Sequence, residues 1–244
     1  NLAIPVYSFV HGSGLMLGMG GAIRYSVLKS HGEDGGSANR QEGAQTDLVF
    51  TNTVCLAALI ALICLAAGLL LPGQLASALG ARGAVHGMTT TYLRVILLFS
   101  PAFLLNDVLI CFVRNDGNPR LSMAAMLAGS MANIVMDYIF IFPLGMGIFG
   151  AVLATGFAPV IGMCVLSGHW FSGKVGVHLI RSRKMFKYTI NIVSLGIPSL
   201  VTEVASGIVM IVFNILILNL NGNTGVPAYG IIANLSLVVN AIYN

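Results

Sequence analysis

Long apolar runs separated by short polar breaks dominate this chain. The clearest example is residues 121–163, where two apolar runs flank one short break at residues 143–147. Neither run carries a Lys, Arg or Glu, and Asp137 is the one acid in this stretch. Each run is about as long as the roughly 20 residues that a helix needs to cross a bilayer. The pattern therefore predicts a transmembrane helical hairpin that holds one buried carboxyl group.

The rest of the chain repeats this pattern. Further helices are predicted at about residues 2–23, 48–71, 88–113 and 188–220, and one more begins near residue 226. In lipid, backbone polar groups must be satisfied within each segment, which favours helices for runs of this length. The sequence thus predicts an all-α polytopic membrane protein with about seven transmembrane helices.

Composition supports a membrane protein and argues against an ordinary soluble one. Hydrophobic residues make up 57% of the chain, charged residues only 8%, and the mean hydropathy is +0.89. The net charge is +4, but the bases lie in polar connections, which indicates topology rather than nucleic-acid binding. Three alternate connections hold Arg24, Lys29 and Arg40, then Arg114 and Arg120, then Lys174, Arg181, Arg183, Lys184 and Lys187. The positive-inside rule predicts that these connections are cytoplasmic, in a multi-pass protein of the cell (inner or plasma) membrane.

Glu203 lies well inside the predicted helix 188–220 and is the first candidate for a functional residue. An acid near the middle of a membrane is costly and is usually functional. Glu203 could exchange a proton or, when ionised, attract a cationic drug or Na⁺. The alternative is a structural acid that is hydrogen-bonded to a neighbouring helix. Pro198 removes a hydrogen bond from the same helix and is predicted to act as a hinge.

Asp137 is the second candidate, with Asn133 one helical turn before it. Two oxygen-bearing side chains on one face would suit Na⁺ or a proton relay, or alternatively a polar clamp between helices. Asp107 is a further candidate for ion coupling or substrate binding, but it lies nearer the cytoplasmic end of its helix, where it could reach the interface or pair with a base, so a structural role is favoured. Tyr138 and Asn214 are candidates for polar groups that line a cavity.

The first predicted helix contains His11 and a glycine pattern. Gly14 and Gly18 form a small-xxx-small spacing, which predicts close contact with another helix. His11 is expected to be packed and hydrogen-bonded, with a proton carrier as the alternative. The four Cys residues show no metal-ligand spacing and are expected to be free thiols.

A weak internal repeat indicates two lobes. The segment NLAIPVYSFVHG from Asn1 is similar to NLSLVVNAIYN from Asn234, and both begin a helix predicted to run from outside to inside. Parallel repeats of this kind are common in transporters. The basic segment 174–187 would then be a cytoplasmic linker.

Four stretches carry a resemblance to a known family. They are GMGGAIRYSVLKSHG (18–32), TYLRVILLFSPAFLLNDVLICFVRNDGNPRLSM (91–123), ANIVMDYIFIFPLGMGIFGAVLATG (132–156) and LGIPSLVTEVASGIVMIVFN (195–214). The chain resembles the multidrug and toxin extrusion (MATE) efflux transporters, of the prokaryotic DinF-like branch. In the twelve-helix pattern of that family it would span helices two to seven and the start of helix eight, as a fragment without the first helix.

The resemblance implies a MATE-like two-lobed helical bundle around a cavity that opens alternately to each side. Residues 1–173 would form most of the N-terminal six-helix lobe, residues 174–187 the linker, and residues 188–244 the start of the C-terminal lobe. The implied activity is export of organic, often cationic, compounds in exchange for Na⁺ or H⁺, without cofactor, catalytic residue or metal other than Na⁺. The seventh-helix acid of the family falls on Glu203. A monomer in the lipid bilayer, without a nucleic-acid partner, is expected.

Two alternatives remain at this point. A lipid-linked oligosaccharide flippase of the same superfamily would share the fold, but such cavities tend to be strongly charged, and this interior holds few charges. An intramembrane aspartyl protease would need two acids together. Asp107 and Asp137 fall on different helices, toward opposite sides of the membrane, without a recognisable catalytic motif.

Overall fold

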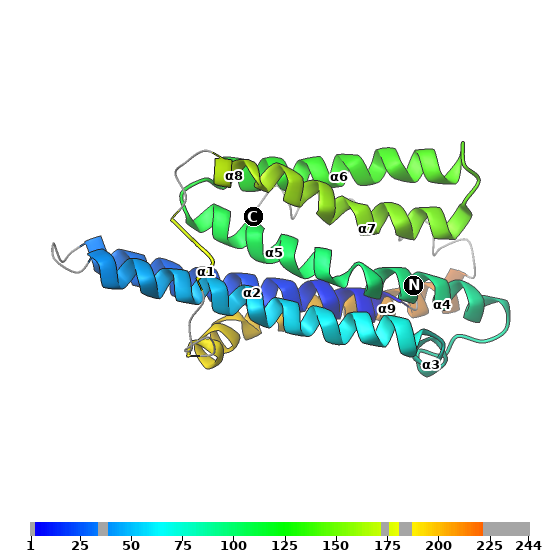
Figure 1. Ribbon diagram of the computed structural model, residues 1–244. Helices are drawn as coiled ribbons and strands as arrows, with labels where there is room; N and C mark the ends of the chain where they lie inside the picture. The colour runs from blue at the N-terminus through cyan, green and yellow to red at the C-terminus, as the bar shows by residue number, and fades with distance from the viewer. Residues whose placement is uncertain (1–2, 34–38, 172–175, 181–186, 222–244) are drawn as a thin grey trace.

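The computed structural model describes residues 3–33, 39–171, 176–180 and 187–221, and every regular element in them is a helix. In chain order the helices are α1 (Ile4–Glu33), α2 (Asn39–Leu70), α3 (Pro72–Ala78), α4 (Ala84–Leu98), α5 (Ser100–Asn115), α6 (Pro119–Ile141), α7 (Gly147–Leu166), α8 (Gly168–Phe171) and α9 (Thr189–Asn221). The long helices lie roughly along one axis (Figure 1). The all-α fold class is therefore confirmed.

One end of this bundle collects the end of α1, the start of α2, the α5–α6 turn and the start of α9 (Figure 1). We refer to it as the basic end, because Lys29, Arg114, Arg120 and Lys187 belong to these parts of the chain. The α3 helix and the α6–α7 turn lie at the opposite end. The predicted grouping of bases at one end of the bundle is thus confirmed for these four residues.

Several helices can cross a membrane. Gly43–Leu70, Pro119–Ile141, Gly147–Leu166 and Thr189–Val209 are each long and apolar enough, and the bent pair Val85–Leu98 and Ser100–Asn115 would make a fifth span. The predicted hairpin of residues 121–163 is confirmed as α6 and α7, whose turn contains Gly145 and Gly147 with positive φ. The protein is a multi-pass membrane protein with four to five spans in the described residues. The helix expected from residue 226 lies outside them.

The predicted single helix 88–113 is two helices, α4 and α5, which meet at a bend of 48°. Pro101 has no N–H to donate to the carbonyl of Leu97. The hydroxyl of Ser100 donates to that carbonyl instead, at 2.7 Å. The bend therefore follows from the local sequence Ser100-Pro101. The single helix 88–113 was predicted from its apolar run alone, without considering this proline.

The predicted polar connection 24–47 is also shorter than expected, because α1 continues to Glu33 and α2 begins at Asn39. Lys, Arg, Gln and Glu are good helix formers, so a helix can continue beyond its apolar run. At the other end of α2 the predicted boundary near residue 71 is confirmed, since α2 ends at Leu70. Pro72 then starts the short helix α3, where its missing N–H costs nothing.

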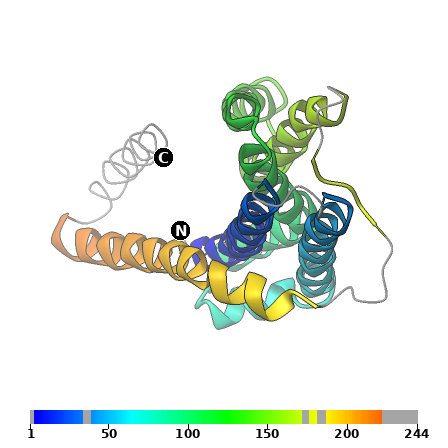
Figure 2. The ribbon, with the colours of Figure 1, turned by 90° about the vertical axis from the view of Figure 1, so that its left-hand side faces the viewer.

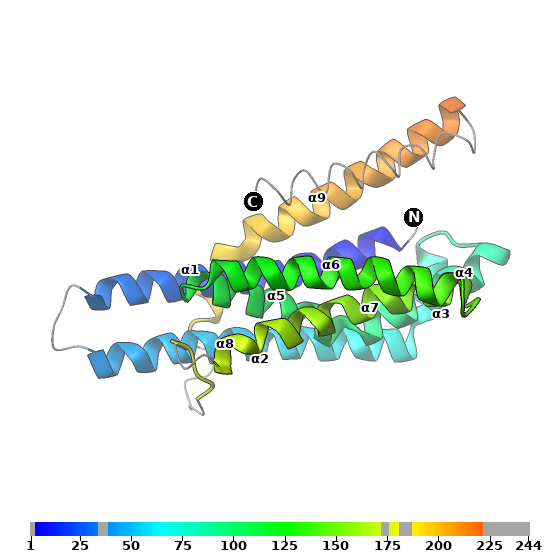
Figure 3. The ribbon, with the colours of Figure 1, turned by 90° about the horizontal axis from the view of Figure 1, so that it is seen from above.

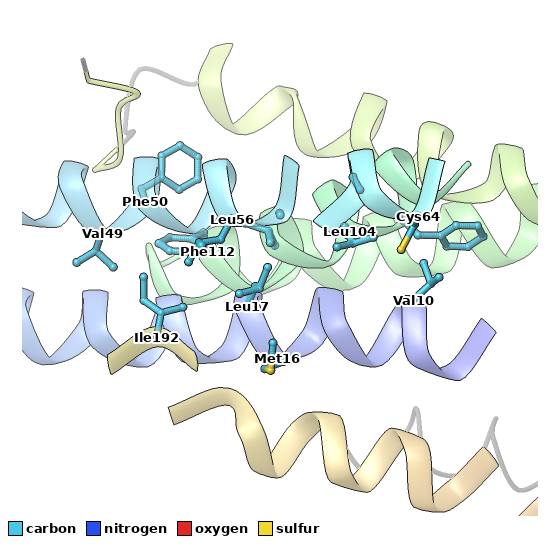
Figure 4. Packing of buried hydrophobic residues seen from close by; sticks show 14 of the residues in the cluster. Val10, Met16, Leu17, Val49, Phe50, Leu56, Cys64, Leu104, Phe112 and Ile192 are labelled. Carbon is cyan, nitrogen blue, oxygen red and sulfur yellow. The ribbon is translucent and has the colours of Figure 1, made fainter. Parts of the chain in front are cut away.

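The core lies where α1 packs against α2 and α5 (Figure 4). Its fully buried side chains include Leu17 from α1, Val49 from α2, and Leu104 and Phe112 from α5. The predicted close contact of Gly14 and Gly18 is confirmed, since both face α5. The α1 helix is thus the central helix of the described bundle.

The α9 helix lies along the other side of α1 and extends away from the bundle toward its C-terminal end (Figures 2 and 3). The two backbones come very close at two glycines. A Cβ added to Gly20 would lie 1.9 Å from the carbonyl oxygen of Ile192, and one added to Gly196 would lie 1.8 Å from that of Met16. Only glycine fits at either position, so α1 and α9 are in direct backbone contact.

Candidate functional site

Three ionisable side chains from three helices meet beside this α1–α9 contact. They are His11 of α1, Asp107 of α5 and Glu203 of α9, and we refer to them as the His11 cluster. The Nδ1 atom of His11 lies 2.8 Å from Oδ2 of Asp107, and its Nε2 atom lies 3.7 Å from Oε1 of Glu203. One imidazole ring therefore stands between two carboxyl groups.

Small residues on α1 make room for both acids. A Cβ on Gly14 would lie 2.5 Å from Oδ2 of Asp107, and one on Gly12 would lie 3.0 Å from Cβ of Glu203. Larger side chains at these two positions would push the acids away from the imidazole. The glycines of α1 thus position the carboxyl groups around His11.

The cluster is closed on one side and open on another. The side chain of Asp107 is 5% exposed, whereas those of His11 and Glu203 are each 30% exposed. The ring of Tyr7 stacks on His11 with 6.0 Å between centroids and contacts Phe103 edge-on. An ion or ligand could therefore reach His11 and Glu203 while Asp107 stays buried.

The chemistry of the cluster depends on how many protons it holds. An ionised carboxylate can only accept hydrogen bonds, and a neutral imidazole has a single N–H to donate. Both ring nitrogens of His11 face a carboxylate, so only the doubly protonated ring can donate to both. The arrangement is thus suited to bind and release a proton or to attract a cation.

A second polar site lies on α6, where Asn133 and Asp137 are half-buried. The Nδ2 atom of Asn133 and the Oδ1 atom of Asp137 are buried, and no described residue forms a hydrogen bond with either atom. Tyr92 of α4 lies close enough to interact electrostatically with Asp137. The predicted sharing of one face by these two oxygen-bearing side chains is compatible with this geometry, and their role stays a prediction.

The remaining predicted site residues lie apart from these two sites. Tyr138 is 64% exposed and packs against the ring of Phe142, 5.4 Å away between centroids. Pro198 lies inside α9, and its carbonyl accepts a hydrogen bond from the hydroxyl of Thr202 at 2.8 Å. The side chain of Asn214 lies outside the described part of the chain. The structure thus does not bring Tyr138 or Pro198 into contact with the His11 cluster.

The prediction for Asp107 needs a correction. Sequence alone allows Asp107 to reach the interface or to pair with a base; it is instead buried, and the base with which it pairs is the imidazole of His11. The physical reason is that α5 packs directly on the glycine face of α1, which places Asp107 inside the bundle. His11 is hydrogen-bonded, as predicted, but its contact with two acids was not foreseen.

A further buried carboxylate marks the basic end. Asp116 follows the last turn of α5, and four donors surround its two oxygens, which we refer to as the Asp116 hub. They are the Tyr25 hydroxyl at 2.5 Å, the Lys29 ammonium at 3.1 Å, the His169 ring at 2.9 Å and the Gly176 amide at 2.7 Å. The hub fastens residues 176–180 beside α1 and the α5–α6 turn. Sequence reasoning missed Asp116, which lies in a turn and not in an apolar run.

Residues 176–180 continue from this hub along α2. The amide of His178 donates to Oδ1 of Asp47 at 2.7 Å, and the amide of Ile180 donates to the hydroxyl of Thr51 at 3.0 Å. Val177 between them is fully buried. This part of the predicted basic linker is therefore docked on the helices.

The fold defines a polytopic helical membrane protein. Its sequence matches the MatE family over residues 3–139, more than half of the chain, and the chain belongs to that family. The multidrug export proteins MepA of Staphylococcus saprophyticus and Staphylococcus aureus are each 27% identical to it over 233 residues, 95% of this chain and 49% of theirs. The chain thus spans about half the length of the curated relatives it matches.

Solved structures of transporters share the fold. The MATE multidrug transporter DinF-BH, in a complex with a ligand, superposes with a TM-score of 0.79 at 25% identity, over 98% of this chain and 52% of that one. A MOP superfamily transporter from Pyrococcus furiosus superposes with a TM-score of 0.73, also at 25% identity and over 98% and 52% of the two chains. The resemblance to MATE transporters of the DinF-like branch is confirmed. Members of this family are transporters and not enzymes, which sets the aspartyl protease alternative aside.

Proposed function

We propose that the complete protein is a secondary active multidrug exporter that exchanges organic cations for Na⁺ or H⁺ by alternating access. Its curated relatives are multidrug export proteins, and one structural relative, a multidrug transporter, is described in a complex with a ligand. Multidrug resistance transporters of the family are described in an inward-facing and in an outward-facing conformation, which supports alternating access here.

The observation that carries this proposal is the position of Glu203. It lies within the span Thr189–Val209, its side chain is 30% exposed, and its carboxylate is 3.7 Å from the nearest ring nitrogen of His11. Glu203 forms no short hydrogen bond with His11, so its carboxylate is available to attract a cation within the span. Glu203 is therefore the residue that we propose to receive the organic cation or to exchange a proton.

Asp137 and Asn133 are our proposal for a second ion site. The buried Oδ1 atom of Asp137 has no hydrogen-bond partner among the described residues, which is costly unless another group or an ion satisfies it. Carboxylate and amide oxygens suit Na⁺, and a carboxylate also suits H⁺. We propose that this site binds the coupling ion.

The proposed function also includes a division of the chain into two lobes and an orientation in the membrane. We propose that residues 1–173 belong to the N-terminal lobe and residues 188–244 to the C-terminal lobe, with the basic end facing the cytoplasm. The α1–α9 contact would then lie between lobes, and a bend at Pro198 would let α9 move relative to α1. We expect a monomer.

Efflux of a fluorescent cationic dye from vesicles tests the proposal, with the complete protein and with a Na⁺ or an H⁺ gradient imposed separately. Gradient-driven efflux is expected for the wild type and identifies the ion. Glu203→Gln is expected to reduce it at least about tenfold, since the amide cannot become an anion. Ser206→Ala, which removes a hydroxyl that bonds to its own helix, is the matched control and should transport normally.

Normal efflux by Glu203→Gln at normal expression would overturn the assignment of Glu203. Absence of efflux with either gradient, from folded wild-type protein, would instead favour the oligosaccharide flippase. The structure of the Pyrococcus furiosus relative is described as having a binding pocket of reverse polarity that suggests a different function. Transport of anionic lipid-linked sugars is therefore the outcome to test next in that case.

A further inference from the structure

The imidazole of His11 becomes a cation when both of its ring nitrogens are protonated, and it then lies beside the carboxylate of Glu203. Glu203 is the proposed site for an organic cation, yet a ring nitrogen of His11 already lies 3.7 Å from its carboxylate. A protonated imidazole carries the same charge as such a substrate. The two cations would compete for one carboxylate.

Asp107 determines which nitrogen of His11 can lose its proton. Asp107 is buried, and its carboxylate lies 2.8 Å from Nδ1. Because an ionised carboxylate can only accept a hydrogen bond, Nδ1 keeps its proton and donates it to Asp107. The exchangeable proton is therefore the one on Nε2, which faces Glu203. When it leaves, the Nε2 lone pair faces the carboxylate, and both groups attract a cation.

We propose that His11, held by Asp107, is the internal cation of Glu203, so that one proton leaves Nε2 of His11 for each organic cation that binds at Glu203. This rests on the proposed function, because it assumes that Glu203 receives the substrate. Charge is balanced, since one positive charge replaces another and no covalent bond other than N–H changes. In this scheme Asp107 is a positioning residue that never contacts the substrate.

Among the described residues, the charges that act on His11 are those of Asp107 and Glu203. The helices packed on α1 present Asp107 from α5 and Glu203 from α9, while Tyr7 of α1 stacks on the ring, and Tyr92 of α4 lies within electrostatic range of Tyr7. Residues 48–70 of α2 contain no charged side chain. A titration that affects substrate binding here would therefore be that of the cluster itself.

The test is binding of a fluorescent cationic dye to the complete purified protein, in a sodium-free potassium buffer, between about pH 5 and about pH 8. For the wild type, the dye Kd is expected to rise about tenfold for each pH unit of acidification where His11 is protonated, and dye binding should release a proton into a weakly buffered solution. His11→Asn keeps a donor for Asp107 and has no exchangeable proton. Its dye Kd should rise much less on acidification than that of the wild type, and dye binding should release no proton from position 11.

Asp107→Asn provides a second variant in case His11→Asn does not fold. It keeps an acceptor for Nδ1 but removes the negative charge beside the ring, so the pH midpoint of dye binding should move to lower pH without loss of binding. An unchanged pH dependence in His11→Asn, or in Asp107→Asn if His11→Asn does not fold, would overturn the role of His11.

Glu203→Gln separates this inference from the function on which it rests. Loss of dye binding at every pH in Glu203→Gln, together with a wild-type pH dependence in His11→Asn, would leave the exporter intact and reject the inference. Full dye binding by Glu203→Gln would reject both the proposed role of Glu203 in binding the organic cation and the proposed role of His11.

Discussion

Two buried aspartates of the same part of the chain, Asp107 within α5 and Asp116 just after it, have opposite surroundings. Asp116 accepts from four donors, two of them from α1, and each donor is within 3.1 Å. Asp107 has His11 as its partner, and that same ring also serves Glu203 at a longer distance. A carboxylate whose two oxygens each accept from two donors, as in Asp116, stabilises the structure around it. The carboxylates of Asp107 and Glu203 share one imidazole, so the contact between the ring and either of them can change.

The electrostatics of the Asp116 hub follow from the hydrogen bonds that Asp116 accepts. Burial alone would raise the pKa of Asp116, but the hydrogen bonds from its four donors lower the pKa below its ordinary value. The carboxylate therefore stays ionised throughout the physiological range. The hub is a permanent fastening between residues 176–180, α1 and the α5–α6 turn, and the comparison predicts that stability depends on it more than on the His11 cluster.

The largest expected effect is that of Asp116→Ala. This change leaves the buried Tyr25 hydroxyl without its acceptor, and it removes the carboxylate that also binds the more exposed Lys29 ammonium and the Gly176 amide. A buried hydrogen-bonding group that loses its partner typically costs about 1–3 kcal/mol, and the exposed Lys29 ammonium adds little because water can solvate it. We expect a clearly lower melting temperature of the detergent-solubilised protein. An unchanged melting temperature would show that the hub does not hold the fold.

The second prediction concerns acid. Because the pKa of Asp116 is lowered in the folded protein, its contribution is fully present above the unfolded value of about 3.9 and is lost as the pH falls through the folded value. The melting temperature of the wild type should therefore exceed that of Asp116→Asn at neutral pH, and the gap should narrow below about pH 4. Other carboxylates titrate in both proteins, so the difference between them isolates Asp116. A gap that stays constant would contradict the role of its charge.

The two regions also show what sequence can and cannot reveal. The hairpin α6–α7 and the membrane class followed from apolar runs alone, because the bilayer fixes the length of a span. The acids Glu203 and Asp137 stood out because charges are rare inside such runs. Both the His11 cluster and the α6 site therefore had at least one member that composition along the chain could identify.

Contacts between helices were much harder to foresee. His11 and Asp107 are far apart in sequence, and apolar runs do not reveal which faces of two membrane helices meet. The signal that was present is the glycine face of α1, since Gly14 predicted a close approach but not the identity of its neighbour. The Asp116 hub gave no signal, because its donors come from distant parts of the chain and one of them is a backbone amide.

The smallest expected effect on stability is that of Asp107→Asn, the counterpart of the changes at Asp116. The amide has nearly the same shape and still accepts the proton on Nδ1 of His11, so the loss is the charge-assisted part of one hydrogen bond, about 1 kcal/mol. We expect a melting temperature close to that of the wild type, alongside the altered pH dependence of dye binding. A destabilisation as large as that of Asp116→Ala would mean that both aspartates are structural, and the distinction between a fastened hub and an exchanging cluster would not hold.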